Sequence, residues 1–307
     1  GLVRDRRAGV SAYYRFDESK VREYTIPFYE NSNYPRLYTY KYPKAGESNS
    51  AVTIHIYDVK NENAVKAQTG PETDQYIPRI RWARTNNRLC IYRMNRLQNK
   101  LELLLTHATN GNTEVIYSEE NPYYIEINDN LTFLPDGQSF IITSEKDGFN
   151  HLYKWNWVKK EGIQLTSGGW DVDKMQGVDE HKQCVYYTAG VISPMERKLY
   201  RVDWNGKKVE CITKGDGLHE ITPCVGFRYF LDKHSRLNAV PVYTLISNKG
   251  TAIRVLEDNA ALKETMADYN LGVVTTLQIP NGKGAMLNAW MIRPVNFDPS
   301  KKYPVLL

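Results

Sequence analysis

The sequence predicts an all-β fold of the β-propeller type, with about five blades. The main observation is a unit of roughly 45 residues that recurs along most of the chain, a period typical of a four-stranded propeller blade. Two phrases repeat in register: residues 150–157 match 197–204 and share Leu-Tyr, and residues 164–168 match 211–215 and share Thr-x-Gly. Copies of the unit begin near Ile77, Glu126, Asp171 and Glu220. Because a propeller is a scaffold, chemistry must be argued from individual side chains.

Composition narrows the possible functions. The chain has 307 residues, 41% of them hydrophobic, which suffices for one large domain or two ordinary ones. Tyr is unusually frequent, with 22 copies against 8 Phe, and it suits half-buried strands. The net charge of +5 is dispersed without a dense basic run, so we expect no nucleic-acid partner. We expect no membrane span, and the basic opening 4–7 is not followed by the apolar stretch of a signal peptide.

The four cysteines are Cys90, Cys184, Cys211 and Cys224, and no two form a C-x-x-C pair. Zinc-site spacing is therefore absent, and we expect no bound metal or other cofactor. Cys90 and Cys184 fall in apolar strand-like runs, which favours buried free thiols. A disulfide between neighbouring blades is the alternative, and the compartment is not fixed by these residues.

The first blade is predicted to contain an insertion. Residues 12–16 and 52–59 alternate like paired strands. Between them, residues 22–46 carry many Tyr, several Pro and mixed charge, too aromatic for a disordered linker and too rich in Pro for a helix. We interpret this stretch as an exposed arm or hairpin that binds a partner.

Turn chemistry separates the following strands. The tetrapeptide 85–88, Pro135-Asp136-Gly137 and Trp204-Asn205-Gly206 supply Asn, Asp and Gly for tight reversals. One helix is predicted over Asn259–Tyr269, with Asn259 as its N-cap.

The last part of the chain departs from the blade pattern. Strands are predicted over 273–280 and 287–294, around a turn at 281–284. The apolar run 303–307 is interpreted as the start of another buried strand, so we expect the chain to be a fragment of a longer polypeptide.

Few residues suit catalysis. No G-x-S-x-G nucleophile motif occurs, and Ser167 lies in the repeated Thr-x-Gly phrase, whose role we interpret as structural. The histidines are scattered without metal-ligand spacing: His55, His107, His151, His181, His219 and His234. We interpret Glu119 and Glu120 as a solvated loop between blades. Tyr123, Tyr124 and Glu126, at the expected start of an inner strand, are the better candidates to face a ligand.

Several phrases together resemble the propeller domain of the dipeptidyl peptidase IV family, closest to its bacterial members. The phrases are Tyr42-Pro43-Lys44-Ala45-Gly46, residues 131–137, 143–153, 165–172, 241–245, 254–259 and Lys301-Lys302-Tyr303-Pro304. The resemblance runs in unbroken order from about Ala12 to Leu307. It implies an eight-bladed propeller joined to an α/β-hydrolase that releases N-terminal dipeptides with Pro or Ala second.

On this resemblance, residues 12–270 are part of the propeller and 271–307 are the connection into a hydrolase domain that carries the Ser, Asp and His triad. Residues 1–11 do not match the family, so its amine-binding glutamates are not assigned here, and no residue of this chain is assigned as catalytic. Tyr123, Tyr124 and Glu126 fall where the family presents side chains toward the extended substrate. The insertion 22–46 resembles the arm that forms homodimer contacts, with the candidates Tyr24, Phe28, Tyr29, Tyr34, Tyr38 and Tyr40.

The leading hypothesis is a non-catalytic propeller that gates and orients peptides for a periplasmic or secreted serine exopeptidase, with a homodimer as the full-length form. A stand-alone propeller that serves as an interaction or sensor module is the main alternative. A propeller that binds glycans is a weaker one. A G-x-S-x-G domain encoded after Leu307 would separate the first from the other two.

Overall fold

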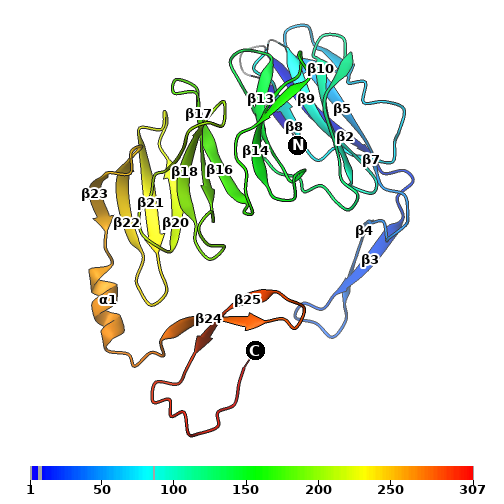
Figure 1. Ribbon diagram of the computed structural model, residues 1–307. Helices are drawn as coiled ribbons and strands as arrows, with labels where there is room; N and C mark the ends of the chain where they lie inside the picture. Colours follow the sequence, from blue (N-terminus) through cyan, green and yellow to red (C-terminus); the bar gives the residue numbers. More distant parts are fainter. Residues whose placement is uncertain (1, 6–8, 86, 307) are drawn as a thin grey trace. The chain divides into compact units, whose positions relative to one another are not determined.

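The computed structural model describes residues 2–5, 9–85 and 87–306, and within them β-sheet dominates (Figure 1). Five sheets of four or five strands follow one another along these residues. They confirm the all-β prediction, because each is consistent with a propeller blade. Parts of two predicted features lie outside the described residues, as does Leu307: Asn86 of the turn 85–88, and Gly1 with residues 6–8 of the N-terminal segment.

The chain folds into two units, of which the first runs to Lys146 and includes Lys154–Gly162. Its first sheet has the strand order β1-β2-β5-β6; its second has the order β11-β10-β9-β7, with β8 also paired to β9. The strands of the first sheet are β1 (Leu2–Asp5), β2 (Val10–Asp17), β5 (Ala51–Asp58) and β6 (Asn63–Lys66). Those of the second are β7 (Gln75–Tyr76), β8 (Ile80–Trp82), β9 (Arg88–Asn95), β10 (Lys100–His107) and β11 (Thr113–Glu120).

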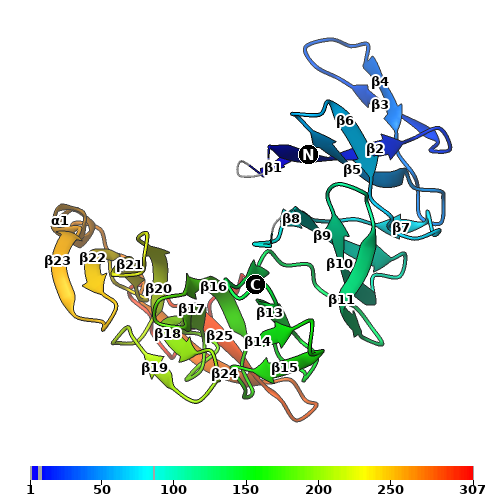
Figure 2. The same ribbon diagram turned by 90° about the horizontal axis from the view of Figure 1, so that it is seen from above.

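Three more sheets follow in the chain. The first has the order β12-β13-β14-β15, with β12 (Thr132–Phe133), β13 (Ser139–Ser144), β14 (His151–Asn156) and β15 (Glu161–Gln164). The second unit comprises Asp147–Tyr153 and the residues from Ile163 onward. Within it, two sheets lie side by side (Figures 1 and 2). They are built from β16 (Val172–Asp179), β17 (Cys184–Ala189), β18 (Lys198–Asp203) and β19 (Val209–Cys211), and from β20 (Leu218–Pro223), β21 (Tyr229–Ser235), β22 (Val242–Ser247) and β23 (Ala252–Glu257).

Burial follows the position of a strand in its sheet. Every residue of β13 and of β17 is buried, whereas every residue of the outermost strands β15, β19 and β23 is exposed. A blade packs against neighbours on both faces, so its middle strands can be buried along their whole length while its outer strand meets solvent. In the second unit the resulting core contains Tyr186, Leu199, Ile212, Ile221 and Phe230.

The threonine of the repeated Thr-x-Gly phrase makes the same hydrogen bond in both copies. Thr166 Oγ1 accepts the backbone N–H of Leu152 at 3.0 Å, and Thr213 Oγ1 accepts that of Leu199 at 3.0 Å. Both threonines are buried. Since an unpaired buried N–H is costly, the phrase recurs to satisfy the same position of the third strand.

Two predicted turns are confirmed. Asp136 Oδ1 accepts the backbone N–H groups of Gln138 (3.0 Å) and Ser139 (2.8 Å), which closes the turn before β13. Gly206 has φ +73°, and a Cβ there would lie 2.9 Å from the carbonyl oxygen of Gln164. Only glycine combines that backbone conformation with such a close approach.

The predicted insertion in the first blade is a hairpin. Strands β3 (Glu23–Phe28) and β4 (Arg36–Lys41) pair in antiparallel register and leave the first sheet between its adjacent strands β2 and β5 (Figure 1). No residue of either strand is buried.

The predicted helix is confirmed and Asn259 occupies its N-cap position, but the Asn259 side chain makes no capping bond. Helix α1 spans Ala260–Ala267, and Asn259 precedes it in a left-handed conformation (φ 54°, ψ 33°) without a side-chain capping bond. Its Nδ2 instead donates to the carbonyl oxygen of Pro241 at 2.6 Å, while Asp258 Oδ1 accepts the N–H of Ala260 at 3.0 Å. The amide is used to tie the helix to the preceding loop, so the neighbouring carboxylate takes over the capping.

The two predicted C-terminal strands are confirmed as the hairpin β24 (Val274–Pro280) and β25 (Met286–Ile292). The expectation of a buried strand from residue 303 is wrong for the described residues 303–306. They are irregular, and Val305 and Leu306 are 82% and 99% exposed. An apolar run becomes a strand only when a partner strand satisfies its backbone groups, and the structure pairs none with this run among the residues it describes.

The cysteines are free thiols as expected, and the alternative of a disulfide is not realised among them. Cys90 and Cys184 are buried, whereas Cys211 and Cys224 are exposed. Burial raises the pKa of Cys184 to about 11 and that of Cys90 further still. Across the described residues, no helix has the length and apolar composition needed to cross a bilayer.

Candidate functional site

The three predicted ligand-facing residues lie together on one exposed connection of the first unit. Tyr123, Tyr124 and Glu126 belong to residues 121–131, named here loop 121–131, which joins β11 to β12. Tyr123 is 88% and Tyr124 46% exposed, and Glu126 is also exposed. We expected Glu126 at the start of an inner strand, but that strand begins only at Thr132. Asn side chains within the loop bond its own backbone, which competes with strand pairing.

The first half of the loop is held from both sides. Asn121 Oδ1 accepts the backbone N–H groups of Tyr123 (2.9 Å) and Tyr124 (3.4 Å), a turn that lifts both rings outward. Ile125 is buried, and its N–H donates to the carbonyl oxygen of Gln98 at 3.0 Å. The tyrosines are therefore displayed between two fixed points.

The second half of the loop is held by charge. Arg79 Nε donates to Asp129 Oδ1 at 2.8 Å. This bond lowers the pKa of the Asp129 carboxyl and raises that of the Arg79 guanidinium. Arg81 donates to the carbonyl oxygens of Leu131 and, at 3.2 Å, of Asp129. Asn130 Nδ2 adds a bond to Thr143 Oγ1 at 3.0 Å.

The interpretation of Glu119 and Glu120 as a solvated loop is wrong, because both end the strand β11. Glu119 accepts hydrogen bonds from the hydroxyls of Tyr117 (2.6 Å) and Ser144 (2.7 Å). Glu120 pairs with Lys100 at 2.6 Å, and this bond raises the pKa of the lysine. Glu120 is thus engaged by a partner on the adjacent strand β10, whereas Glu119 is bonded to hydroxyls of its own strand and of β13.

The arm β3–β4 has two chemically different faces. Its register places Tyr24 opposite Tyr40 and Ile26 opposite Tyr38, so these side chains share one face, with Phe28 at its end. The other face pairs Glu23 with Lys41 (3.3 Å) and joins the hydroxyls of Thr25 and Thr39 (2.8 Å). The other two candidates, Tyr29 and Tyr34, lie in the loop between the strands and are 66% and 85% exposed. The arm thus presents a partly exposed aromatic face on which no other strand of the described residues packs.

Cations flank the aromatic face of the arm. Lys44 Nζ lies 3.9 Å from the ring centroid of Tyr24, and the Arg36 guanidinium lies 5.4 Å from that of Phe28. Tyr38 and Tyr40 are in tilted contact at 5.3 Å between centroids. These contacts order the rings into a continuous surface before any partner binds.

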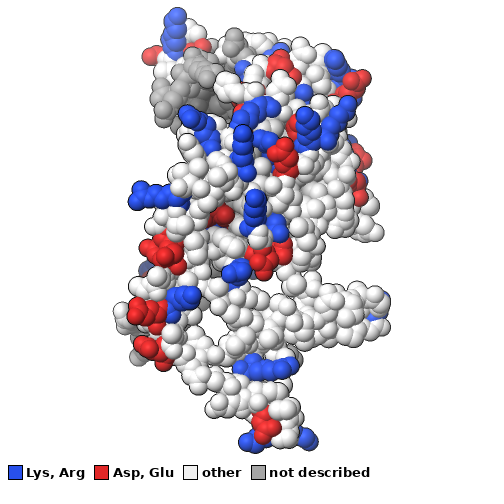
Figure 3. Space-filling model, turned by 60° about the vertical axis from the view of Figure 1, so that its left-hand side comes forward, with Lys and Arg blue, Asp and Glu red and all other residues white. Residues whose placement is uncertain are grey.

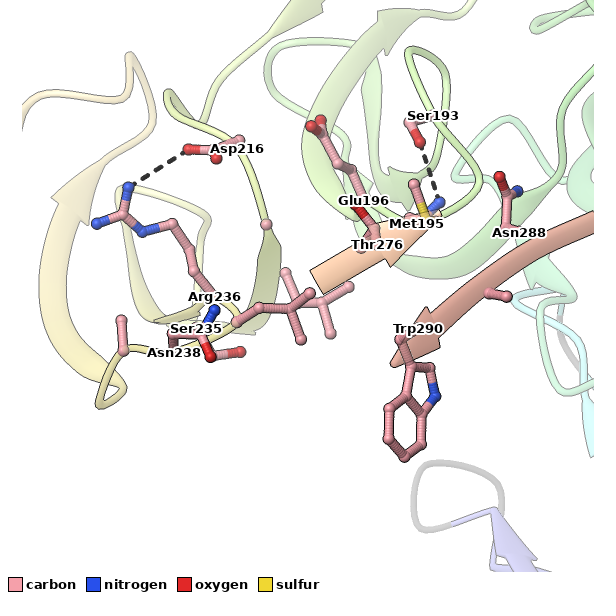
Figure 4. A pocket seen from close by; sticks show the side chains of 15 residues that line it. Ser193, Met195, Glu196, Asp216, Ser235, Arg236, Asn238, Thr276, Asn288 and Trp290 are labelled. Carbon is pink, nitrogen blue, oxygen red and sulfur yellow. Dashed lines mark hydrogen bonds and ion pairs between the residues drawn. The ribbon is translucent and has the colours of Figure 1, made fainter. Parts of the chain in front are cut away.

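A cavity that was not predicted from the sequence lies in the second unit. It has a volume of about 880 Å³, within the range of small-molecule sites, and is formed by hairpin β24–β25 and the ends of the neighbouring sheets (Figure 4). Its lining includes Met195, Leu237 and Trp290, and the ion pair of Asp216 with Arg236 at 3.5 Å. Because these residues come from separate strand ends, only the folded chain brings them together.

The hairpin is fixed beside this cavity by one side chain. Asn238 Nδ2 donates to the carbonyl oxygen of Val274, and Asn238 Oδ1 accepts the N–H of Val274, both at 2.8 Å. The paired bonds mimic a strand ladder and set the position of β24 within the second unit.

The structure brings together two histidines that appear unrelated in the sequence. His219 and His234 are opposite residues of β20 and β21, and their rings stack with 4.3 Å between centroids. His219 Nδ1 lies 2.9 Å from a carboxylate oxygen of Asp232, and both residues are buried. The alternation of buried and exposed residues along β20 could have predicted that His219 is buried. Its pairing with His234 could be predicted only once the register of β20 and β21 was known. Because the imidazole stacks on a second imidazole inside a blade, we assign this pair to packing.

The described residues contain no group of three or more side chains with the arrangement of a metal site. The surface seen in Figure 3 carries Lys and Arg interspersed with Asp and Glu, in line with the dispersed charge of the sequence. Loop 121–131 and the arm both expose tyrosine side chains to solvent.

The comparisons with known proteins all point to the same family. A family model described as the dipeptidyl peptidase IV (DPP IV) N-terminal region matches residues 9–241. A probable dipeptidyl peptidase 4 of Arthroderma benhamiae is 27% identical over 311 residues, which cover 96% of this chain and 40% of the relative. A probable dipeptidyl-aminopeptidase B of Coccidioides posadasii is 30% identical over 330 residues, which cover 96% of this chain and 35% of the relative.

Solved structures agree with these relatives. The crystal structure of Porphyromonas gingivalis dipeptidyl peptidase 4 matches with a TM-score of 0.89 and 34% identity, over 96% of this chain and 42% of that one. A putative dipeptidyl aminopeptidase IV from Bacteroides ovatus matches with a TM-score of 0.87 and 26% identity, over 99% of this chain and 46% of that one. The chain therefore spans less than half the length of these proteins.

Proposed function

Because this chain belongs to the family of dipeptidyl peptidase IV N-terminal regions, we propose that it is the non-catalytic propeller portion of a serine-type dipeptidyl peptidase. The observation that carries the proposal is the family match over most of the chain, supported by the agreement in fold with bacterial relatives. In this role the propeller admits and orients peptides whose N-terminal dipeptide, with Pro or Ala second, is released.

Loop 121–131 is the proposed contact with the extended part of the peptide. Its two exposed tyrosines offer flat apolar surfaces, and Glu126 offers a carboxylate to backbone N–H groups or a cationic side chain. The loop is held at several points, so little conformational entropy is lost when a peptide binds.

The test of this activity uses the full-length protein. Amides of Gly-Pro and Ala-Pro with a free N-terminus should be cleaved, and the same substrates with a blocked N-terminus should not. Equal cleavage of blocked and free substrates would contradict the proposal. Absence of cleavage together with capture of a macromolecular partner would favour the stand-alone interaction module instead.

The contribution of the loop is tested with the variant Tyr123→Ala/Tyr124→Ala. For a peptide several residues long, KM should rise about tenfold, the size of effect expected when an aromatic contact is truncated. Tyr57→Ala is the matched control, because Tyr57 is a partly exposed tyrosine on β5, in another sheet. An equal rise of KM in the control would contradict the proposal that loop 121–131 contacts the peptide.

We propose the arm as a homodimer contact. The support is its uncovered aromatic face opposite a polar face, an arrangement that excludes water when a second copy of that face is applied to it. In sedimentation of the full-length protein, Tyr38→Ser/Tyr40→Ser should shift dimer toward monomer, whereas Thr25→Ala on the polar face should not. A wild-type protein that sediments as a monomer at all concentrations would refute the dimer.

A further inference from the structure

Two arginines of the second sheet reach into loop 121–131 from the same side. Arg79 immediately precedes β8 and Arg81 lies within it, so the two residues are separated by one position of an extended segment and project in the same direction. The segment is itself fixed, because the N–H of Tyr92 in β9 donates to the carbonyl oxygen of Arg79 at 2.9 Å. The arginines thus extend from a rigid base.

The two arginines bind different parts of the loop. Arg79 binds a side chain, through the 2.8 Å bond from its Nε to Asp129 Oδ1. Arg81 binds the backbone, through the carbonyl oxygens of Asp129 and Leu131. An isolated exposed ion pair contributes little to global stability. Two guanidinium groups bound to Asp129 and Leu131 nevertheless restrict where that part of the loop can lie.

Glu126 lies between this contact and the anchor at Ile125. On one side, the Ile125 side chain is buried and its N–H is bonded to Gln98. On the other side, Asp129 is held by the arginines. Without the arginines, the next fixed points after Ile125 would be the bond of Asn130 to Thr143 and strand β12, so Glu126 would lie in a longer unrestrained segment that binding must order.

We propose that Arg79 and Arg81 are positioning residues that hold Asp129 and Leu131 and thereby present Glu126 to a bound peptide. The inference rests on the proposed function of loop 121–131. It adds that the position of Glu126 relative to the peptide is set by residues at strand β8 and not by the loop itself.

The experiment follows the loop and the catalysis separately in the full-length protein. Hydrogen–deuterium exchange measures protection of residues 126–131, and steady-state kinetics with a peptide several residues long measures KM and kcat. The test variant is Arg79→Gln/Arg81→Gln. The control is Arg88→Gln, which breaks the similarly exposed pair of Arg88 with Glu114 (3.5 Å) in the same sheet. The rescue variant is Arg79→Asp/Arg81→Gln/Asp129→Arg, which keeps the loss of Arg81 and restores the ion pair with its charges exchanged.

In the test variant, exchange of residues 126–131 should rise about tenfold and KM several-fold, while kcat stays within about twofold and β9 and β10 stay protected. The rescue variant should recover at least part of both effects, and the control should show neither. Unchanged exchange in residues 126–131 would overturn the proposal, whether or not the protein proves to be a peptidase. Faster exchange with an unchanged KM would also overturn it, by showing that the arginines order the loop without positioning it for substrate. Loss of protection in β9 and β10 would show a merely structural role.

Discussion

Replacing Thr166 by Val tests how the repeated phrase stabilises a blade. Thr166 Oγ1 accepts the N–H of Leu152 and lies 3.0 Å from His151 Nδ1. His151 Nε2 lies 3.0 Å from the carbonyl oxygen of Gly168, which can only accept, so Nε2 donates this bond; in the imidazole tautomer with its proton on Nε2, Nδ1 is the acceptor. The hydroxyl of Thr166 therefore donates to His151 and accepts from Leu152, and valine, of similar shape, removes both bonds.

The size of the effect follows from the groups left unpaired. Leu152 and His151 are both 0% exposed, so neither the N–H nor Nδ1 can turn to water. Leaving one buried polar group unsatisfied costs about 1–3 kcal/mol, so Thr166→Val should destabilise by about 2–6 kcal/mol. In the next copy, Thr213→Val leaves only the N–H of Leu199 without its acceptor, so a loss of stability of about 1–3 kcal/mol is expected.

The assay is urea unfolding of the two variants side by side, followed by tryptophan fluorescence. Trp170 packs edge-on against His151 with 4.9 Å between ring centroids and reports directly on this blade. Thr166→Ser and Thr213→Ser are the controls, because serine keeps the hydroxyl; each should cost less than the corresponding valine. Equal losses for the two valine variants would refute the reasoning, since the extra bond to His151 would then contribute nothing.

Three further predictions concern other parts of the fold. Gly177→Ala should destabilise by about 1–3 kcal/mol in thermal unfolding, because at φ +145° its Cβ would lie 2.5 Å from the ring of Phe227; an unchanged Tm would contradict this. His219→Leu leaves Asp232 as an uncompensated buried carboxylate and should cost about 3–5 kcal/mol, and Asp232→Asn added to it should recover part of the loss. Asp129, whose pKa is lowered by its partner, should hold loop 121–131 above the ordinary aspartate pKa of ~3.9 and release it as the pH falls through the lowered value. Loop exchange that accelerates already near neutral pH would count against that assignment.

The blades were predictable because their pattern is local and repeated. The matched phrases around Leu152 and Leu199 place the third strand of two sheets, and the Thr-x-Gly phrase marks the end of that strand's hydrogen-bonded partner. Each copy must bury its middle strands between neighbours, so the same residue types recur at the same spacing. The number of blades therefore follows from counting copies.

The failures have a common physical origin in contacts made across the fold. Asn259 has the sequence context of a cap, yet its amide is taken by Pro241, eighteen positions earlier in the chain. Glu120 looks like part of an acidic loop, yet Lys100 on the adjacent strand pairs with it. In these two cases the prediction treated a polar side chain as local, whereas a partner distant in the sequence determined its role.

The same reasoning explains why the residues proposed for recognition lie outside the repeat. A position inside the repeated pattern is committed to packing or to a backbone bond, as Thr213 shows, so it has little freedom to vary toward a ligand. Loop 121–131 and the arm connect strands whose sheets form without them. Their exposed aromatic side chains therefore do not reduce the stability of the blades. The side chains of such segments are held in a defined position only if the blades bind the segment. Arg79 and Arg81 bind loop 121–131 in this way. Specificity in this chain should therefore change by substitution at the loop tip, while changes at its anchors should weaken all peptides alike.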